Sequence, residues 1–250
     1  MSVLSASEAF EVAETGEPAA GRGTSSTSKK RCVYEQYVQP CLVELFATAM
    51  FVFVGCASVI GSVGIAGAVQ PALAHGLALG VLIMVFGKIS GGHFNPAVSL
   101  SVYLCGGMKL ILLVPYVLAQ ISGGMIGAGL ARVRKSNSTK KRIKKHSELA
   151  KCMLGEVMMT LIVTMVVCMG AVNSQTSTPG AAFCIGLIVS ANIFAGGLTS
   201  GACMNPARAF GPAVVANHWS HHWIYWVGPL CGALLTVSFI RYCVVLRTRG

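Results

Sequence analysis

The chain has 250 residues, of which 54% are hydrophobic and 11% are charged, and its formal net charge is +11. Soluble domains carry about 25% charged residues, so this composition excludes an ordinary soluble protein and favours a membrane protein. Nine of the 19 Lys and Arg residues lie between Arg132 and Lys151. The positive charge therefore belongs mostly to one loop and does not indicate a nucleic-acid-binding surface.

The first 36 residues are polar, and a basic flank, Lys29-Lys30-Arg31, lies near their end. They contain no apolar h-region, so they do not resemble a signal peptide. We expect a disordered cytoplasmic tail over residues 1–36 and one membrane domain over residues 37–250. The cysteines include no Cys-x-x-Cys pair, so their spacing indicates neither a metal site nor a redox pair.

Six long apolar runs follow, each with about the 20 residues that a helix needs to cross a membrane. They cover roughly residues 41–60, 71–89, 110–131, 152–172, 180–198 and 222–246. Two shorter apolar segments, residues 96–105 and 206–216, would be helices of about 15 Å, half of a hydrocarbon core of roughly 30 Å. We therefore predict an all-α membrane protein with six transmembrane helices and two re-entrant half-helices.

The two halves of the chain contain the same features in the same order. Glu44 opens the first run and Glu156 the fourth, and an Asn-Pro-Ala triplet follows 51 positions later at Asn95 and 49 positions later at Asn205. Each repeat, about residues 37–131 and 150–246, contains three spans. Because three is odd, the second repeat must lie inverted in the membrane, and a site is expected where the repeats meet near the midplane.

Pairs of glycines four residues apart occur in three of the runs. This GxxxG spacing lets helix backbones approach closely, and packing alone is enough to account for it. The pairs are Gly76 with Gly80, Gly123 with Gly127, and Gly228 with Gly232.

Helix capping explains the triplets Asn95-Pro96-Ala97 and Asn205-Pro206-Ala207. Asn is a preferred N-cap because its side-chain oxygen accepts from an unpaired backbone N–H, and Pro suits the next position because it has no N–H. The amide NH₂ is then free to donate to another molecule. Two half-helices that start at one point also direct the positive ends of their dipoles there. Such a centre favours a neutral acceptor, such as water, and repels protons and other cations.

These triplets, with residues 72–80 and 205–217, resemble the aquaporin (major intrinsic protein) family and look closest to its aquaporin-8 branch and plant vacuolar relatives. The resemblance covers about residues 36–246. It implies the aquaporin fold, a homotetramer in membrane lipid, and passive conduction of water, ammonia and hydrogen peroxide, with no catalysis and no cofactor. Both termini are expected in the cytoplasm. The plasma membrane is the favoured location, with an intracellular or mitochondrial membrane as the alternative.

The resemblance also implies a selectivity filter of four residues, which the motif positions assign to His75, Ile193, Ala202 and Arg208. Arg208 would be a fixed cation with five N–H donors, which repels cations at the mouth of the pore. Ordinary water channels of the family have an aromatic residue and a histidine where this chain has His75 and Ile193. We therefore expect a filter wider than that of a strict water channel and apolar on one side. A packing role for His75 is the alternative.

Two carboxylates and one thiol complete the predicted site. Glu44 and Glu156 would each cost on the order of 2.5–3.5 kcal/mol in lipid, so both must face the bundle. The family precedent is that they accept hydrogen bonds from the backbone of the re-entrant loops, and a proton relay is the alternative. Cys203, two positions before Asn205, is either a pore-adjacent thiol or a packed one. We expect no metal site.

The link between the third and fourth runs, residues 132–148, is unusually basic. Clusters of Lys and Arg predict a cytoplasmic loop. The family topology places this loop outside the cell, and a glycosylation sequon at Asn137-Ser138-Thr139 makes sense only there. We follow the family topology and expect Asn137 to be an extracellular glycosylation site, although nothing in the sequence explains the basic charge.

Three other functions fit parts of the pattern. An alternating-access transporter also uses inverted repeats and broken helices, but the runs offer no spare acid or base for ion coupling. A non-conducting junctional protein would not need both asparagines and Arg208. Glycerol-conducting relatives carry Asp directly after the filter Arg, where this chain has Ala209, and lack an aromatic pair such as Tyr225-Trp226.

Overall fold

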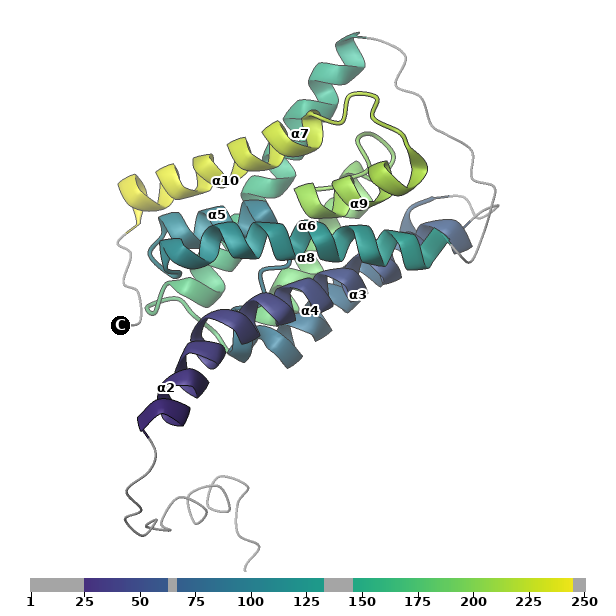
Figure 1. The fold of residues 1–250 in the computed structure, drawn as a ribbon. Helices are drawn as coiled ribbons and strands as arrows, with labels where there is room; N and C mark the ends of the chain where they lie inside the picture. The colour runs from purple at the N-terminus through teal and green to yellow at the C-terminus, as the bar shows by residue number, and fades with distance from the viewer. Residues whose placement is uncertain (1–24, 63–66, 133–145, 245–250) are drawn as a thin grey trace, which may run out of the picture.

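The computed structural model describes residues 25–62, 67–132 and 146–244, which form a bundle of helices (Figure 1). The long helices of the bundle are α3 (Gln39–Gly61), α4 (Val69–Ser90), α6 (Leu110–Arg132), α7 (His146–Val167), α8 (Ala181–Gly196) and α10 (Ile224–Cys243). The short elements are α2 (Ser25–Val33), α5 (Pro96–Leu104), α9 (Pro206–Ala216) and the π-helical turns η1 (Tyr34–Val38) and η2 (Cys168–Val172).

The six predicted apolar runs coincide with the six long helices. Among the described residues, five of these helices are long and apolar enough to cross a membrane. The sixth, α8, has 16 residues, which corresponds to about 24 Å. It is shorter than the predicted run because the chain turns at Gly197 toward the second Asn-Pro-Ala triplet.

The N-terminal flank differs from our expectation. Instead of a disordered tail up to residue 36, α2 and η1 continue directly into α3 and project from the bundle (Figure 1). No Gly or Pro interrupts the sequence between Ser25 and Pro40, and Arg31 donates to Glu35 over 2.8 Å one turn later, a pairing that supports exposed helices. Residues 1–24 lie outside the described residues.

The two half-helices have the predicted lengths and lie toward opposite ends of the bundle in Figure 1. Helix α5 packs on α10, and α9 packs on α6. Each half-helix thus rests on a long helix of the other repeat, as the inverted repeat requires. The remaining main contacts, α3 with α6, α7 with α10 and α4 with α8, hold the six long helices together.

Small residues allow these helices to cross at close range. A Cβ added at Gly186 would lie 3.1 Å from the Gly80 Cα and would overlap the Gly76 carbonyl oxygen at the α4–α8 crossing. Added Cβ atoms at Gly127 on α6 and Gly232 on α10 would likewise collide with the backbones of α3 and α7. The predicted packing role of the GxxxG glycines is therefore confirmed.

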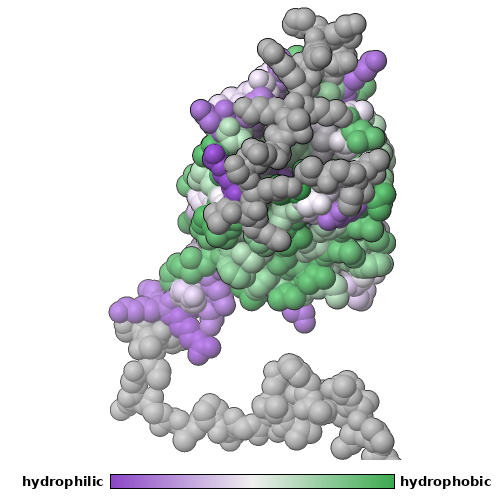
Figure 2. Space-filling view, turned by 90° about the vertical axis from the view of Figure 1, so that its right-hand side faces the viewer, coloured by the Kyte–Doolittle hydropathy of each residue, from purple (hydrophilic) through white to green (hydrophobic). Residues whose placement is uncertain are grey.

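Polarity is distributed as expected for a chain surrounded by lipid. Large hydrophobic side chains such as Leu77, Val81 and Leu118 are exposed. Figure 2 shows a broad hydrophobic surface on one face of the bundle, from which the hydrophilic α2 segment projects. Polar side chains such as Glu44 and Gln120 are fully buried. The interior must therefore supply hydrogen-bond partners for these groups.

The α4–α8 crossing yields a first prediction. Gly186→Leu should destabilise the folded protein by about 1–3 kcal/mol, because the added side chain overpacks the contact with α4. A Cβ at Gly129 on α6 meets nothing within 4 Å, so Gly129→Leu serves as the matched control. Thermal unfolding in detergent, followed by intrinsic fluorescence and size-exclusion chromatography, measures both variants. Equal behaviour of the two variants would contradict the close-packed crossing.

Candidate functional site

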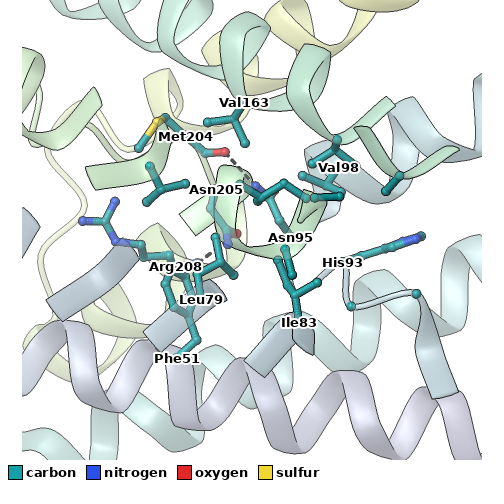
Figure 3. A pocket seen from close by; sticks show the side chains of 18 of the residues that line it. Phe51, Leu79, Ile83, His93, Asn95, Val98, Val163, Met204, Asn205 and Arg208 are labelled. Carbon is teal, nitrogen blue, oxygen red and sulfur yellow. Dashed lines mark hydrogen bonds between the residues drawn. The ribbon is translucent and has the colours of Figure 1, made fainter. Parts of the chain in front are cut away.

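A narrow cavity of about 70 Å³ lies at the centre of the bundle, where the two half-helices begin (Figure 3). Its wall is mainly apolar, with Asn95, Asn205 and Arg208 among its polar members. The apolar lining comes from several helices and includes Phe51, Leu79, Ile83, Val98, Val163, Ile185 and Val189. A molecule in this space therefore meets few hydrogen-bonding groups.

Both asparagines cap their half-helices as the sequence predicted. Asn95 and Asn205 have extended backbones directly before α5 and α9. The Asn95 Oδ1 accepts from the Ala97 backbone N–H over 2.9 Å. The Asn205 Oδ1 accepts from the backbone N–H groups of Ala207 over 2.9 Å and Arg208 over 3.2 Å. Each oxygen is thereby fixed, and the amide nitrogen is turned away from its own helix.

The amide nitrogens are not fully free, which corrects our expectation. The Asn95 Nδ2 donates to the Met204 carbonyl over 2.9 Å, and the Asn205 Nδ2 donates to the Phe94 carbonyl over 2.8 Å (Figure 3). Each asparagine thus binds the residue that precedes the other. An amide carries two N–H groups, so one donor on each asparagine is left for a molecule in the cavity.

An unusual backbone conformation directs these two carbonyls toward the opposite loop. Phe94 has a φ of 49° and Met204 a φ of 55°, in the left-handed region that residues other than glycine rarely adopt. Such strain persists only where the surroundings hold it. Both residues are almost completely buried, and their backbone N–H groups are bound by carboxylates.

Glu44 and Glu156 supply those carboxylates. The Glu44 Oε1 accepts from the His93 N–H over 3.0 Å and its Oε2 from the Phe94 N–H over 2.7 Å. In the second repeat, the Glu156 Oε1 accepts from the Cys203 N–H over 2.8 Å and its Oε2 from the Met204 N–H over 2.7 Å. Both side chains are 0% exposed. This is the arrangement expected of carboxylates that support the loops.

A serine and a tyrosine complete the same pattern in each repeat. Ser90 donates to Glu44 over 2.7 Å, and Ser200 donates to Glu156 over 2.6 Å. The hydroxyls of Tyr116 and Tyr225 donate to the carbonyls of these serines over 2.7 and 2.8 Å. The sequence analysis did not predict this hydrogen-bonding role for any of the four residues, although each serine lies five positions before its Asn.

The first loop has an additional polar network that the sequence analysis also missed. The Gln120 Nε2 donates to the Glu44 Oε2 and to the Ser99 Oγ, both over 2.8 Å. The His93 Nδ1 lies 3.1 Å from the same Ser99 Oγ, and its side chain extends away from the two asparagines (Figure 3). The available signal was Gln120 itself, a polar residue inside an apolar run.

Arg208 is held against the second loop. Its Nη1 donates to the carbonyls of Ala202 over 2.7 Å and Cys203 over 2.9 Å, and Ala202 presents its carbonyl with a φ of 46°. Arg208 and Cys203 both line the cavity. The Cys203 thiol donates to the Asn205 carbonyl over 3.2 Å, so it is both packed and adjacent to the cavity.

The other three predicted filter residues, His75, Ile193 and Ala202, are buried, and they are not among the residues that line this cavity. His75 is 3% exposed, its Nδ1 lies 2.7 Å from the Pro71 carbonyl oxygen, and its ring packs edge-on against the cavity residue Phe51 with centroids 5.8 Å apart. Ile193 and Ala202 belong to the same buried cluster as Phe51. Of the four predicted filter residues, Arg208 is the one that lines the cavity, and the assignment of His75, Ile193 and Ala202 to a filter stays a prediction.

An aromatic cluster follows the second half-helix. The ring of His222 lies 5.2 Å from that of Trp219 and 6.0 Å from that of Phe210, and its Nε2 accepts from the Trp226 Nε1 over 3.1 Å. Burial among these rings lowers the pKa of His222. The cluster fixes the connection between α9 and α10.

The predicted glycosylation site Asn137 and the basic residues 133–145 lie outside the described residues.

Comparison with known proteins gives this arrangement a context. The family model described as major intrinsic protein matches residues 32–240. The chain is 53% identical over 216 residues to aquaporin-8 of Rattus norvegicus, covering 83% of this chain and 82% of that protein. It is 39% identical over 210 residues to aquaporin TIP1-2 of Musa acuminata, covering 79% and 83%.

A solved structure has the same fold. The aquaglyceroporin from Plasmodium falciparum superposes with a TM-score of 0.72, covering 83% of this chain and 97% of that chain at 22% sequence identity. The aquaporin fold predicted from the sequence is therefore confirmed. Together with the family match over most of the chain, these similarities establish that the chain belongs to the major intrinsic protein family of membrane channels for water and small solutes, which are not enzymes.

Proposed function

We propose that this channel passively conducts water, ammonia and hydrogen peroxide and excludes protons and other cations. The observation that carries the proposal is the pair of asparagines at one small cavity, each with its oxygen and one N–H already bound to protein. Each asparagine then offers a single oriented donor in an otherwise apolar wall. Such a centre accommodates a small neutral acceptor.

Exclusion of protons follows from the direction of these donors. A water molecule that accepts from both asparagines has its own hydrogens turned outward, so it cannot accept a proton from a neighbouring water. The N-termini of α5 and α9 add the positive ends of two helix dipoles at the same point. The Arg208 guanidinium adds a fixed positive charge on the side of the second loop. All three features oppose the entry of a cation.

The residues near Arg208 support the wider solute range. In the proposed filter, His75 and Arg208 provide the polar groups, Ile193 provides an apolar side chain, and Ala202 adds little bulk. Ammonia and hydrogen peroxide are small and neutral, so they exchange hydrogen bonds with the polar side as they lose water. Glycerol needs a longer polar track, and ammonium is repelled by Arg208. The flux should therefore depend on the concentration of neutral ammonia, which increases with pH.

The hydrogen bonds between the loops favour a channel over an alternating-access transporter. A transporter must separate its two repeats in each cycle. Here the centre is joined by Asn95 to Met204 and by Asn205 to Phe94, and four buried backbone N–H groups beside it are bound to carboxylates. Opening such a centre would leave polar groups unpaired in a membrane interior.

The proposed assembly is a homotetramer with one pore per protomer, in the plasma membrane and with both termini in the cytoplasm. The large exposed hydrophobic side chains on α3, α4, α6 and α8 support contact with lipid or with other protomers. The family topology then requires the 132–148 link, with Asn137, to be outside the cell.

Selectivity provides the test of the solute range. Ile193→His and His75→Phe should each lower the ammonia and peroxide permeability of proteoliposomes more than the water permeability, because both changes make the constriction tighter. Leu187→Ala, at an exposed position of the same helix as Ile193, is the control and should change none of the three fluxes. Stopped-flow measurements with glycerol as a fourth solute check the result. An equal reduction of all fluxes would show that these positions do not form the selective constriction.

Proton exclusion has a separate test at the second cap. Asn205→Asp places a carboxylate where a neutral amide donates, so it should raise cation and proton leakage and lower water permeability. Asn217→Asp is the matched control, since Asn217 follows α9 and uses its Oδ1 as an acceptor for Trp219, which a carboxylate can also do. Proton flux in vesicles loaded with a pH-sensitive dye distinguishes the variants. Unchanged exclusion in Asn205→Asp would count against the dipole argument.

The orientation can be tested on intact cells. An epitope tag inserted after Ser138 should be accessible to antibody without permeabilisation, because three spans that start from a cytoplasmic N-terminus would end outside the cell. A tag inserted at residue 20, in the N-terminal segment, is the control and should require permeabilisation. Access to the Ser138 tag only after permeabilisation would reverse the proposed topology.

A further inference from the structure

Two buried thiols meet where the first half-helix ends. Cys105 is the C-cap of α5, and Cys168 is the first residue of the π-helical turn η2. They are 4% and 0% exposed and lie in one buried cluster with Val237 and Ile240 of α10. The elements that carry the two thiols, α5 and η2, are in direct contact. The two cysteines are 63 positions apart in the sequence, so the sequence alone does not indicate this contact.

The two elements that carry the thiols also contribute residues to the wall of the cavity. Val98, Ser101 and Cys105 recur at helical spacing and so share one face of α5, and Val98 lines the cavity. On the other side, η2 contains both Cys168 and the cavity residue Ala171. The two elements are in contact. A change in the distance between the two sulfurs therefore moves both elements, and with them the cavity residues Val98 and Ala171.

A cation near the pair favours its reaction. Arg241 on α10 is exposed and its Nη2 donates to the Leu104 carbonyl over 2.8 Å, one residue before Cys105. This positive charge offsets the negative end of the α5 dipole, and a neighbouring cation stabilises the reactive thiolate. Cys105 follows the residue that Arg241 binds and is slightly exposed, whereas Cys168 is fully buried, so Cys105 is the thiol that an oxidant meets first.

We propose that Cys105 and Cys168 form a redox-sensitive dithiol that hydrogen peroxide converts to a disulfide, which narrows the cavity. The Cys105 sulfur attacks one peroxide oxygen, and the O–O bond breaks to give a sulfenic acid and the first water. The Cys168 sulfur then attacks the sulfenic sulfur, the S–O bond breaks, and hydroxide leaves with the Cys168 proton as the second water. The two thiols lose two electrons, and the peroxide gains them.

The disulfide would pull α5 and η2 together. Bonded sulfurs lie about 2.05 Å apart, closer than two thiol sulfurs that are not bonded can lie. The movement brings Val98 and Ala171 toward each other across one end of the cavity, so flux should fall. Our proposed topology places this end at the cytoplasm, where thiols are normally kept reduced, so the pair would be open by default and would close under oxidation.

A covalent test comes first. The full chain in phosphatidylcholine vesicles is treated with hydrogen peroxide on both sides of the membrane, denatured, alkylated and digested, and the peptides are analysed by mass spectrometry without reduction. We expect a linked peptide pair containing Cys105 and Cys168, absent from Cys105→Ser and Cys168→Ser. Complete alkylation of both thiols after oxidation would overturn the proposal. This result does not depend on the proposed solute range, because the oxidant is supplied on both sides.

Water permeability of the same vesicles tests the consequence. Oxidation should reduce the permeability of the unmodified chain, and dithiothreitol should restore it. Cys168→Ser, and Cys168→Ala if the serine variant fails to fold, should keep its permeability after oxidation. Cys184→Ser removes an exposed thiol on α8 and should behave as the unmodified chain does. If the unmodified chain and both Cys168 variants lose the same fraction of their permeability, this pair does not control the flux.

Discussion

The structure depends on one reciprocal contact at its centre. Asn95 donates to the Met204 carbonyl, and Asn205 donates to the Phe94 carbonyl, so each repeat binds the residue that precedes the cap of the other. In a membrane interior, an unpaired backbone group costs several kcal/mol. The contact therefore allows two irregular loops to exist at this depth, and it fixes the distance between the two half-helices that start there.

The buried carboxylates are the second condition for this centre. An isolated charge in such a place would be very unfavourable, but Glu44 accepts four hydrogen bonds and Glu156 accepts three. In each repeat, two of these bonds come from consecutive backbone N–H groups of the loop. The carboxylate thus holds the left-handed residue whose carbonyl the opposite asparagine needs. The buried carboxylate, the left-handed residue and the capping asparagine of the opposite repeat therefore stabilise one another.

Features set by local chemistry were predictable from the sequence, whereas features set by long-range contact were not. The caps and half-helices follow from Asn-Pro beside short apolar segments, and the glycine crossings follow from their spacing. The bond from Asn95 to Met204 depends on the positive φ of Met204, which no residue type indicates. The contact of Cys105 with Cys168 likewise depends on how α5 meets η2. Similarly, α2 was missed because polar composition was read as disorder, although the segment has helix-compatible residues and an Arg31–Glu35 pair.

The function depends on where the two repeats differ. Three positions after each Asn, the first repeat has Val98 and the second has Arg208, and both line the same cavity. The Arg208 Nη1 donates to the Ala202 and Cys203 carbonyls, which keeps the cation at the wall instead of across the pore. In the function that we propose, the symmetric frame therefore centres a neutral molecule between two equal caps, while the one-sided guanidinium selects the molecules that reach this centre.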